Sequence, residues 1–123
     1  MRLLLDTHIV LWWLANDPRV RPIQDTVIEA REVFVSAVTP WELGIKQQRG
    51  TLRLTRPIES DFAANHFKQL AVTFDHARQI GELPHHHRDP FDRMLVAQCM
   101  VERLTLVTHD KAILAYPCNT LKV

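Results

Sequence analysis

The first apolar segment of the chain, Leu3-Leu4-Leu5, is very short and is followed at once by an acid, Asp6. Three consecutive leucines are typical of a strand that is buried on both faces, as in a parallel sheet covered by helices. In open α/β sheets, ligands bind in the crevice at the carboxyl ends of the strands. Asp6 is therefore either a solvated residue that merely ends the strand or a functional carboxylate at the edge of a sheet.

Further acids follow later apolar segments in the same way. Glu42 and Asp110 each come after a run that reads as a strand, and Asp92 stands at the start of a strongly apolar helical segment. If the strands are parallel, these three acids and Asp6 meet at the same edge of the sheet. The recurrence favours a functional role for the four carboxylates.

Segments of strand length alternate with segments of helical periodicity along the chain. This alternation predicts an α/β fold, a three-layer sandwich with a central, mainly parallel sheet of about five strands flanked by helices. At 123 residues, the chain is expected to form a single domain over residues 1–123. We expect strands at 2–5, 33–38, 71–74, 104–108 and 119–121, and helices at 9–14, from 22 onward, 40–49, 58–70, 76–83, 90–101 and 110–114.

Two adjacent tryptophans, Trp12 and Trp13, lie in the first expected helix. Neighbouring residues point about 100° apart on a helix, so the two rings face different surroundings. Either one ring joins the core and the other serves a protein interface, or both belong to the core.

Composition and charge limit the classes of protein to consider. Hydrophobic residues make up 46% of the chain, and the formal net charge is +1. This charge excludes the strongly basic surface of an electrostatic nucleic-acid binder, but not an enzyme that meets RNA locally. The N-terminus lacks the pattern of a signal peptide, and its longest apolar run falls short of the ~20 residues that span a bilayer. We therefore expect a cytoplasmic protein with no membrane segment, in which Cys99 is buried and forms no disulfide with Cys118.

Two of the four acids also fit a purely structural role. The segment Thr39-Pro40-Trp41-Glu42 matches a capping box, and Glu42 is spaced to pair with Lys46. Asp92 falls in the first turn of a helix whose expected N-cap is Asp89, where the helix dipole favours acids. A cap and a metal ligand do not exclude each other, so both interpretations stay open.

Four carboxylates cannot stay close together and ionised without a compensating charge. Mg²⁺ and Mn²⁺ supply that charge, because they take oxygen ligands, lower the pKa of a water and neutralise phosphoryl oxygens. The sequence has no P-loop and no G-x-S-x-G motif that would indicate another chemistry. The run His85-His86-His87 is expected to form a loop rather than a metal site, because three consecutive histidines point in different directions.

Four segments resemble, in order and spacing, the PIN-domain ribonucleases, and specifically the VapC-like toxins of bacterial toxin–antitoxin modules: Leu4-Leu5-Asp6-Thr7-His8, Thr39-Pro40-Trp41-Glu42-Leu43, His87-Arg88-Asp89-Pro90-Phe91-Asp92-Arg93-Met94-Leu95-Val96-Ala97 and Leu106-Val107-Thr108-His109-Asp110. The resemblance covers essentially the whole chain. It implies a PIN-like fold and a Mg²⁺- or Mn²⁺-dependent endoribonuclease. Asp6, Glu42 and Asp92 match the family's acidic triad, Asp110 its fourth acid, and Thr108 a small hydroxyl residue before that acid. The resemblance also implies a homodimer and a cognate VapB-like antitoxin that wraps the toxin and blocks its site.

Our leading hypothesis is therefore a metal-dependent endoribonuclease toxin that acts on RNA. The catalytic and metal-binding residues are expected to be Asp6, Glu42, Asp92 and Asp110, with Asp89 as the helix cap. Candidate contacts for the RNA phosphates are Arg93, Lys46 and the arginines at 49, 53 and 56.

Two other hypotheses stay open. A PIN fold that has lost its activity would act as a binding module through protein partners, although the retention of all four acids argues against it. A phosphohydrolase with an Asp nucleophile after the first strand typically carries a second Asp two residues later. Here that position is His8.

Overall fold

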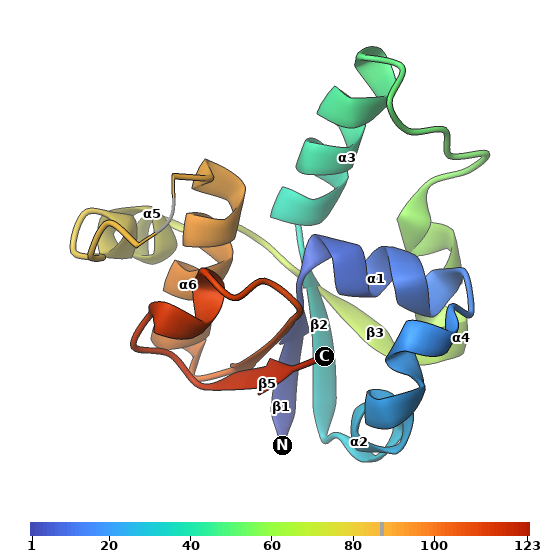
Figure 1. Cartoon of the computed structure of the whole chain (residues 1–123), viewed down its shortest axis with the longest axis horizontal. Coiled ribbons are helices and arrows are strands. Elements are labelled where there is room, and N and C mark those ends of the chain that lie inside the picture. The colour runs from blue at the N-terminus through green and yellow to red at the C-terminus, as the bar shows by residue number, and fades with distance from the viewer. Residues whose placement is uncertain (87) are drawn as a thin grey trace.

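The computed structural model describes residues 1–86 and 88–123 and is built on one parallel sheet (Figure 1). Within these residues the sheet has five strands in the order β3-β2-β1-β4-β5, and each neighbouring pair is parallel. The prediction of a mainly parallel, five-stranded sheet is confirmed. The strands are β1 (Arg2–Leu5), β2 (Glu32–Ser36), β3 (Phe67–Leu70), β4 (Thr105–Thr108) and β5 (Thr120–Lys122).

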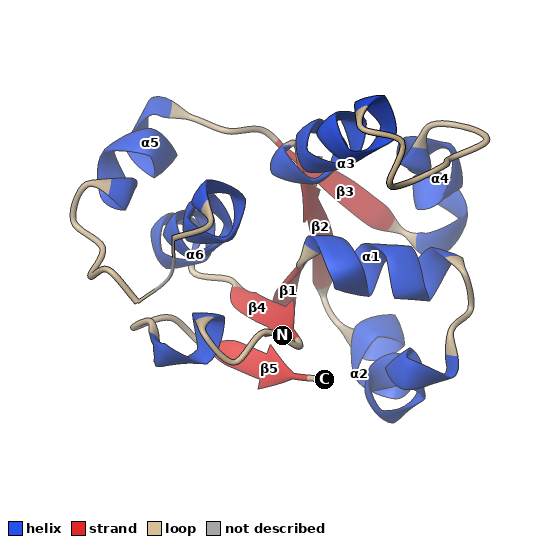
Figure 2. Cartoon of the chain, turned by 45° about the horizontal axis from the view of Figure 1, so that its top comes forward, coloured by secondary structure: helices blue, strands red, loops and turns tan. Residues whose placement is uncertain are grey.

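Helices connect the strands of the described chain. They are α1 (Thr7–Leu14), α2 (Gln24–Glu29), α3 (Val38–Gln48), α4 (Phe62–Asn65), α5 (Phe74–Ile80) and α6 (Pro90–Glu102), with short 3-10 helices η1 (Pro18–Ile23), η2 (Ile58–Asp61) and η3 (Ile113–Ala115). In both views α1, α2 and α4 lie on one side of the sheet, and α5 and α6 lie on the other (Figures 1 and 2). The predicted three-layer sandwich is therefore confirmed, with α3 projecting beyond the sheet (Figure 1).

The three leucines of β1 serve both halves of the core. Leu3 and Leu5 pack in one buried cluster with Ile9 of α1, and Leu4 packs in a second cluster with Leu95 of α6. All five side chains are fully buried. Successive side chains of a strand point to opposite faces, so an uninterrupted apolar run is needed where helices cover both faces.

The predicted helix over 58–70 is wrong. The chain forms η2 and α4 and then turns at His66, whose φ of 57° lies in the left-handed region. A left-handed residue ends a helix, and Phe67 therefore enters the sheet as the first residue of β3. The pairing of β3 with β2 runs from Val33↔Phe67 to Ser36↔Leu70.

The predicted strand over 71–74 is wrong for the same reason, because β3 comes earlier in the chain. Residues 71–73 form a loop, and Phe74 begins α5. The N-cap of α5 is Thr73 rather than Asp75, and it forms a capping box with the imidazole of His76.

Other boundaries move by a few residues. The turn before Pro22 becomes η1, so α2 begins only at Gln24, and β2 ends at Ser36. The helix expected from Asp110 is reduced to η3. The predicted start of α6 is confirmed: Asp89 is its N-cap, and its carboxylate accepts hydrogen bonds from two backbone N–H groups of the first turn.

The two tryptophans of α1 are both half-buried and face different neighbours. Trp13 lies 6.0 Å from the Phe67 ring, and its indole N–H donates to Asn65 over 2.9 Å. Trp12 points toward the other side of α1, where its ring meets His109. Trp13 thus ties α1 to the α4–β3 connection, whereas Trp12 lies nearer the carboxyl edge of the sheet.

The two-sided core makes a direct prediction for Leu4, which is fully buried. We expect Leu4→Ala to lower the free energy of unfolding by about 2–5 kcal/mol, because it leaves a cavity between the sheet and α6. Ile28→Ala is the matched control, since Ile28 is 66% exposed and its loss is expected to cost less than about 0.5 kcal/mol. Urea denaturation of both variants measures the difference, and equal losses would contradict the assignment of Leu4 to the core.

Candidate active site

The carboxyl edge of the sheet carries the candidate acids. Asp6 directly follows β1, and Asp110 comes two residues after β4, which pairs with β1 in parallel. Glu42 lies in α3, which follows β2, and β2 is the other neighbour of β1. The order β2-β1-β4 therefore brings the segments of three acids to one edge.

Asp6 is a buried acid, with only 3% of its surface exposed. One carboxylate oxygen caps α1 by accepting from the backbone N–H groups of His8 (2.9 Å) and Ile9 (3.3 Å). The other accepts a 2.6 Å hydrogen bond from the Thr108 hydroxyl of β4. The N-cap of α1 is therefore Asp6, and Thr7 is the first residue of the helix.

Burial raises the pKa of Asp6 above its ordinary value of 3.8, although the hydrogen bonds from Thr108 and from the backbone of Ile9 oppose the rise. The physical cause is the loss of water around the charged form. The surroundings of Asp6 therefore favour its protonated form more than water does.

Glu42 is also buried, at 7% exposed, and it does not belong to a capping box. The helix α3 begins at Val38, with Ala37 at the N-cap, so Thr39 already lies inside the helix. Glu42 instead accepts a 2.9 Å hydrogen bond from the hydroxyl of Thr7 at the start of α1. The capping-box interpretation of this acid is thus wrong, because its side chain bonds to Thr7 rather than to the start of its own helix.

The second oxygen of Glu42 lies 3.2 Å from the ammonium of Lys46, one turn further along α3. This is the ion pair that the spacing predicted. The Lys46 side chain is 36% exposed and that of Glu42 only 9%. A cation therefore already stands beside the buried acid at the site.

Asp110 is joined to Asp6 through Thr108. The hydroxyl of Thr108 donates to Asp6 and accepts from the backbone N–H of Asp110 over 3.0 Å. One carboxylate oxygen of Asp110 accepts from the backbone N–H of Ala112, which fixes the turn after β4. The expectation that Thr108 orients a neighbouring acid is matched by these contacts.

Asp92 lies in the first turn of α6, a helix that contacts α3. Phe91 of α6 precedes Asp92, and Trp41 of α3 precedes Glu42. Their rings meet edge to face, with centroids 4.8 Å apart, and this contact joins the two helices. Asp89 uses its carboxylate as the N-cap of α6, as expected. The aromatic contact therefore sets the spacing between α3 and α6 where they carry their acids.

As the side chains stand, no three His, Cys, Asp or Glu residues of the described chain are grouped closely enough to hold a metal ion. The donor chemistry nevertheless suits a hard cation, since the edge offers carboxylate oxygens with hydroxyl partners. Asp6 and Glu42 are buried acids whose described contacts are neutral donors and one lysine. Binding of an ion would require the carboxylates to turn toward one another.

Hydroxyl groups are the part of the site that the sequence did not predict, apart from Thr108. Thr7 and Thr39 are buried and lie 3.1 Å apart at their hydroxyl oxygens, next to Glu42. The sequence pattern had indicated a helix cap at Thr39. The signal that identifies them is their place in the sequence: each stands within three residues of an edge acid.

Arg93 does not extend toward a substrate. Its guanidinium donates to the backbone carbonyls of Ile80 (3.2 Å) and Pro84 (3.0 Å) and to the hydroxyl of Tyr116 (3.2 Å). It thereby fastens the loop before α6. His85 and His86 lie in that loop, as predicted, whereas His87 lies outside the described residues.

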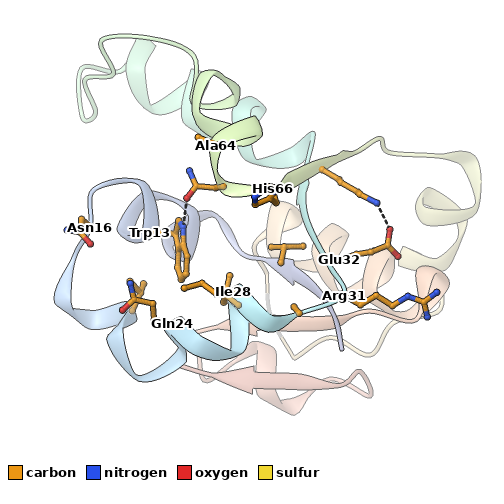
Figure 3. A pocket seen from close by; sticks show the side chains of 14 residues that line it. Trp13, Asn16, Gln24, Ile28, Arg31, Glu32, Ala64 and His66 are labelled. Carbon is orange, nitrogen blue, oxygen red and sulfur yellow. Dashed lines mark hydrogen bonds and ion pairs between the residues drawn. The ribbon is translucent and has the colours of Figure 1, made fainter.

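A large hollow in the surface lies elsewhere. It has a volume of about 460 Å³ and is lined by residues of α1, η1, α2, α4 and the beginnings of β2 and β3, among them Trp13, Ile28 and His66 (Figure 3). None of the four edge acids lines it. The candidate site is therefore an open edge with buried acids, not this hollow.

The sequence and the fold were both compared with those of known proteins. The family model of the PIN domain matches residues 3–117. The chain belongs to the PIN-domain family. A curated relative of this PIN domain, Ribonuclease VapC22 of Mycobacterium tuberculosis, is 30% identical over 112 residues, which cover 88% of this chain and 86% of the relative.

Solved structures with the same fold include a toxin–antitoxin complex from Klebsiella pneumoniae, which matches with a TM-score of 0.70 and 16% identity over 98% of this chain and 96% of the other. VapBC2 from Rickettsia felis, bound to a DNA fragment from its promoter, matches with a TM-score of 0.75 and 15% identity over 99% of this chain and 98% of the other. FitAcB from Neisseria gonorrhoeae matches with a TM-score of 0.65 and 22% identity over 98% and 96% of the two chains. At these identities the likeness establishes the fold of this PIN domain.

The remaining expectations concern cysteines and membranes. Cys99 is buried and Cys118 half-buried; both are free thiols, and burial raises the pKa of Cys99 well above its ordinary range. In the described part of the chain, every helix is too short or too polar to cross a bilayer.

The raised pKa of Asp6 predicts a gain in stability when its charge is removed. An acid whose pKa is raised by folding binds its proton more tightly in the folded state, so stability falls as the pH rises above 3.8 through the raised pKa. Asp6→Asn removes the charge and keeps a cap oxygen for α1. In metal-free buffer we expect this variant to unfold at a higher temperature than the wild type at neutral pH. The gain should vanish below the ordinary pKa of 3.8.

Thermal unfolding followed by circular dichroism across this pH range measures the effect. Asp25→Asn is the control, because Asp25 is exposed on α2, and it should show no such pH-dependent gain. An Asp6→Asn variant less stable than the wild type at neutral pH would show that the carboxylate is well solvated in the fold.

Proposed function

We propose that this protein is a Mg²⁺- or Mn²⁺-dependent endoribonuclease that hydrolyses RNA phosphodiester bonds, and that it is the toxin of a type II toxin–antitoxin pair. One observation carries the proposal: hydroxyl groups hold the acids at the sheet edge. Thr108 contacts both Asp6 and the backbone of Asp110, and Thr7 contacts Glu42. The 30% identity to a VapC ribonuclease supports the activity.

The four acids are proposed as the residues that hold the metal ion: Asp6, Glu42, Asp92 and Asp110. Carboxylate oxygens are the ligands that Mg²⁺ and Mn²⁺ prefer. When bound, such ions activate a water for attack on phosphorus and neutralise charge on the phosphoryl oxygens.

The residues of the chain orient the acids. Thr108 donates to Asp6, and Thr7 donates to Glu42, so each buried carboxylate has a fixed direction and a partner for one oxygen. The N-terminal dipole of α6 favours the charged form of Asp92 in its first turn. Both threonine hydroxyls are buried and already bonded, so we assign them to positioning rather than to nucleophilic attack.

The partners follow from the same family. The neighbours VapBC2 and FitAcB, and a complex from Klebsiella pneumoniae described as a toxin–antitoxin complex, support a cognate VapB-like antitoxin for this chain. We also propose a homodimer, in line with the exposed apolar side chains Trp41 and Phe74, which are 60% and 88% exposed. An enzyme that cuts cellular RNA would act in the cytoplasm.

A catalytically inactive PIN-fold binding module is the competing function. It would retain the fold and bind protein partners without cutting RNA. The hydroxyl contacts to Asp6 and Glu42 argue against it, because a module without catalysis gains nothing from buried charges that weaken its fold. The phosphohydrolase alternative is less well supported, since exposed His8 stands where that class needs a second acid.

The nuclease assignment predicts metal-dependent cleavage of RNA. We expect the purified protein to cut a mixed RNA pool with Mn²⁺ and to lose this activity in EDTA. Asp92→Asn, prepared identically, should lower the rate by more than the roughly 10- to 100-fold that loss of an outer-shell partner of a metal costs. Gel analysis of the products and sequencing of their ends measure the rate and the cut sites.

Two results would count against this assignment. Equal cleavage by the wild type and Asp92→Asn would indicate a contaminating nuclease. Absence of cleavage together with absence of Mn²⁺ binding in calorimetry would favour the inactive binding module.

The ion pair between Lys46 and Glu42 predicts an effect on metal affinity. Thr7 donates to one carboxylate oxygen of Glu42, and the ammonium nitrogen of Lys46 lies 3.2 Å from the other. The ammonium group of Lys46 therefore competes with any metal ion for this carboxylate. A partly exposed pair contributes about 0.2–1 kcal/mol, and Lys46→Met should therefore bind Mn²⁺ roughly 1.4- to 5-fold more tightly.

Calorimetric titration with Mn²⁺ measures this change. Arg49→Met is the control, because Arg49 is an exposed cation at the end of α3. Weaker Mn²⁺ binding by Lys46→Met than by the control would show that Lys46 supports the site instead of competing at it.

A further inference from the structure

Three aromatic rings lie near the carboxyl ends of β1 and β4: two in α1 and one directly after β4. The Trp12 ring meets His109 edge to face, with centroids 5.4 Å apart, and lies 6.3 Å from the ring of His8. Trp12 is half-buried, whereas both histidines are exposed. We call His8, Trp12 and His109 the ring platform.

Arg19 also contacts the indole of the ring platform. Its guanidinium carbon lies 4.1 Å from the centroid of the Trp12 ring, which is a cation–π contact. Asp17 holds this guanidinium through two hydrogen bonds of 3.0 and 2.7 Å, and these bonds lower the pKa of Asp17 to about 2. The indole therefore contacts a cation that is held in place and the two imidazoles.

His109 is held in one orientation. Its Nδ1 lies 2.7 Å from the backbone carbonyl oxygen of Val123, and because a carbonyl only accepts, Nδ1 carries the hydrogen. The His109 ring is thus held by a hydrogen bond and by its contact with Trp12, yet it stays exposed. A ring that is fixed and exposed loses little conformational entropy when a flat ligand stacks on it.

The platform is continuous with the acids. His8 comes two residues after Asp6, and His109 directly precedes Asp110. The strands that lead to them, β1 and β4, are hydrogen-bonded neighbours in the sheet. An RNA strand with one phosphate at the acids would therefore carry its neighbouring bases past these rings.

We propose that the ring platform positions the substrate by stacking an unpaired nucleobase beside the cleaved phosphate. The inference rests on the nuclease function proposed above and adds the contact residues. Bases of single-stranded RNA stack on aromatic side chains, histidine included, whereas paired bases keep their faces inside the duplex. The imidazoles act by stacking, and the hydrogen of His109 Nδ1 serves only to orient the ring.

Binding of RNA without cleavage tests the platform by itself. A short fluorescein-labelled single-stranded RNA is titrated with protein in EDTA and followed by fluorescence anisotropy. We expect His8→Ala and His109→Ala each to weaken binding about ten-fold, as loss of one stacking ring does. His109→Phe should bind close to the wild type, because it keeps a flat ring. The same RNA annealed to its complement should bind more weakly and should not distinguish the variants.

His66→Asn is the matched control. His66 is an exposed histidine far along the chain, at a left-handed position that asparagine also adopts. It should bind RNA like the wild type, and circular dichroism of every variant verifies the fold.

Three results would overturn the platform. Unchanged RNA binding in both alanine variants would leave the rings as a contact for a protein partner. Equal losses in His109→Phe and His109→Ala would exclude stacking. Tighter binding of the duplex than of the single strand would exclude an unpaired base.

Cleavage with Mn²⁺ is measured on the same proteins, so that the two proposals fail separately. Alanine variants that bind and cut RNA like the wild type would refute the platform and leave the nuclease standing. A wild type that binds through the platform but does not cut would refute the nuclease alone.

Discussion

The removal of Asp6 from water is the constraint on which the rest of the site depends. A buried carboxylate is costly unless hydrogen bonds replace its hydration. Here two backbone N–H groups of α1 and the hydroxyl of Thr108 replace it. The same acid therefore ends β1, begins α1 and binds β4 to both. Any change that moves it disturbs the strand, the helix and the site together.

Much of the fold follows from local pattern. The apolar run before Asp6 and the run before Asp110 became neighbouring buried strands, because helices cover both faces of the sheet and leave no room for polar alternation. The Asp89-Pro90 start of α6 was also readable, since an N-cap carboxylate followed by proline satisfies local needs and requires no tertiary contact. These features are set by residues a few positions apart.

The errors come from places where tertiary contacts overrule local pattern. The segment 58–70 has helical periodicity, yet pairing with the open edge of β2 draws its last residues into β3. At Glu42 the sequence contains a good capping box, but the hydroxyl of Ser36 accepts from the N–H of Val38 and starts α3 earlier. This releases Glu42 to Thr7. A reading of the sequence pairs Glu42 with Lys46 correctly but does not find Thr7, because Thr7 is 35 residues away.

The hydrogen bond between Thr108 and Asp6 joins residues 102 positions apart. β1 is made well before β4, yet they are adjacent in the finished sheet. A growing chain on the ribosome thus carries Asp6 and Glu42 long before it has Thr108, Asp110 or the His109 ring. For a chain of this family, the delay has a protective side. The edge that assembles the acids does not exist until β4 has been made, so fragments that end before β4 lack it.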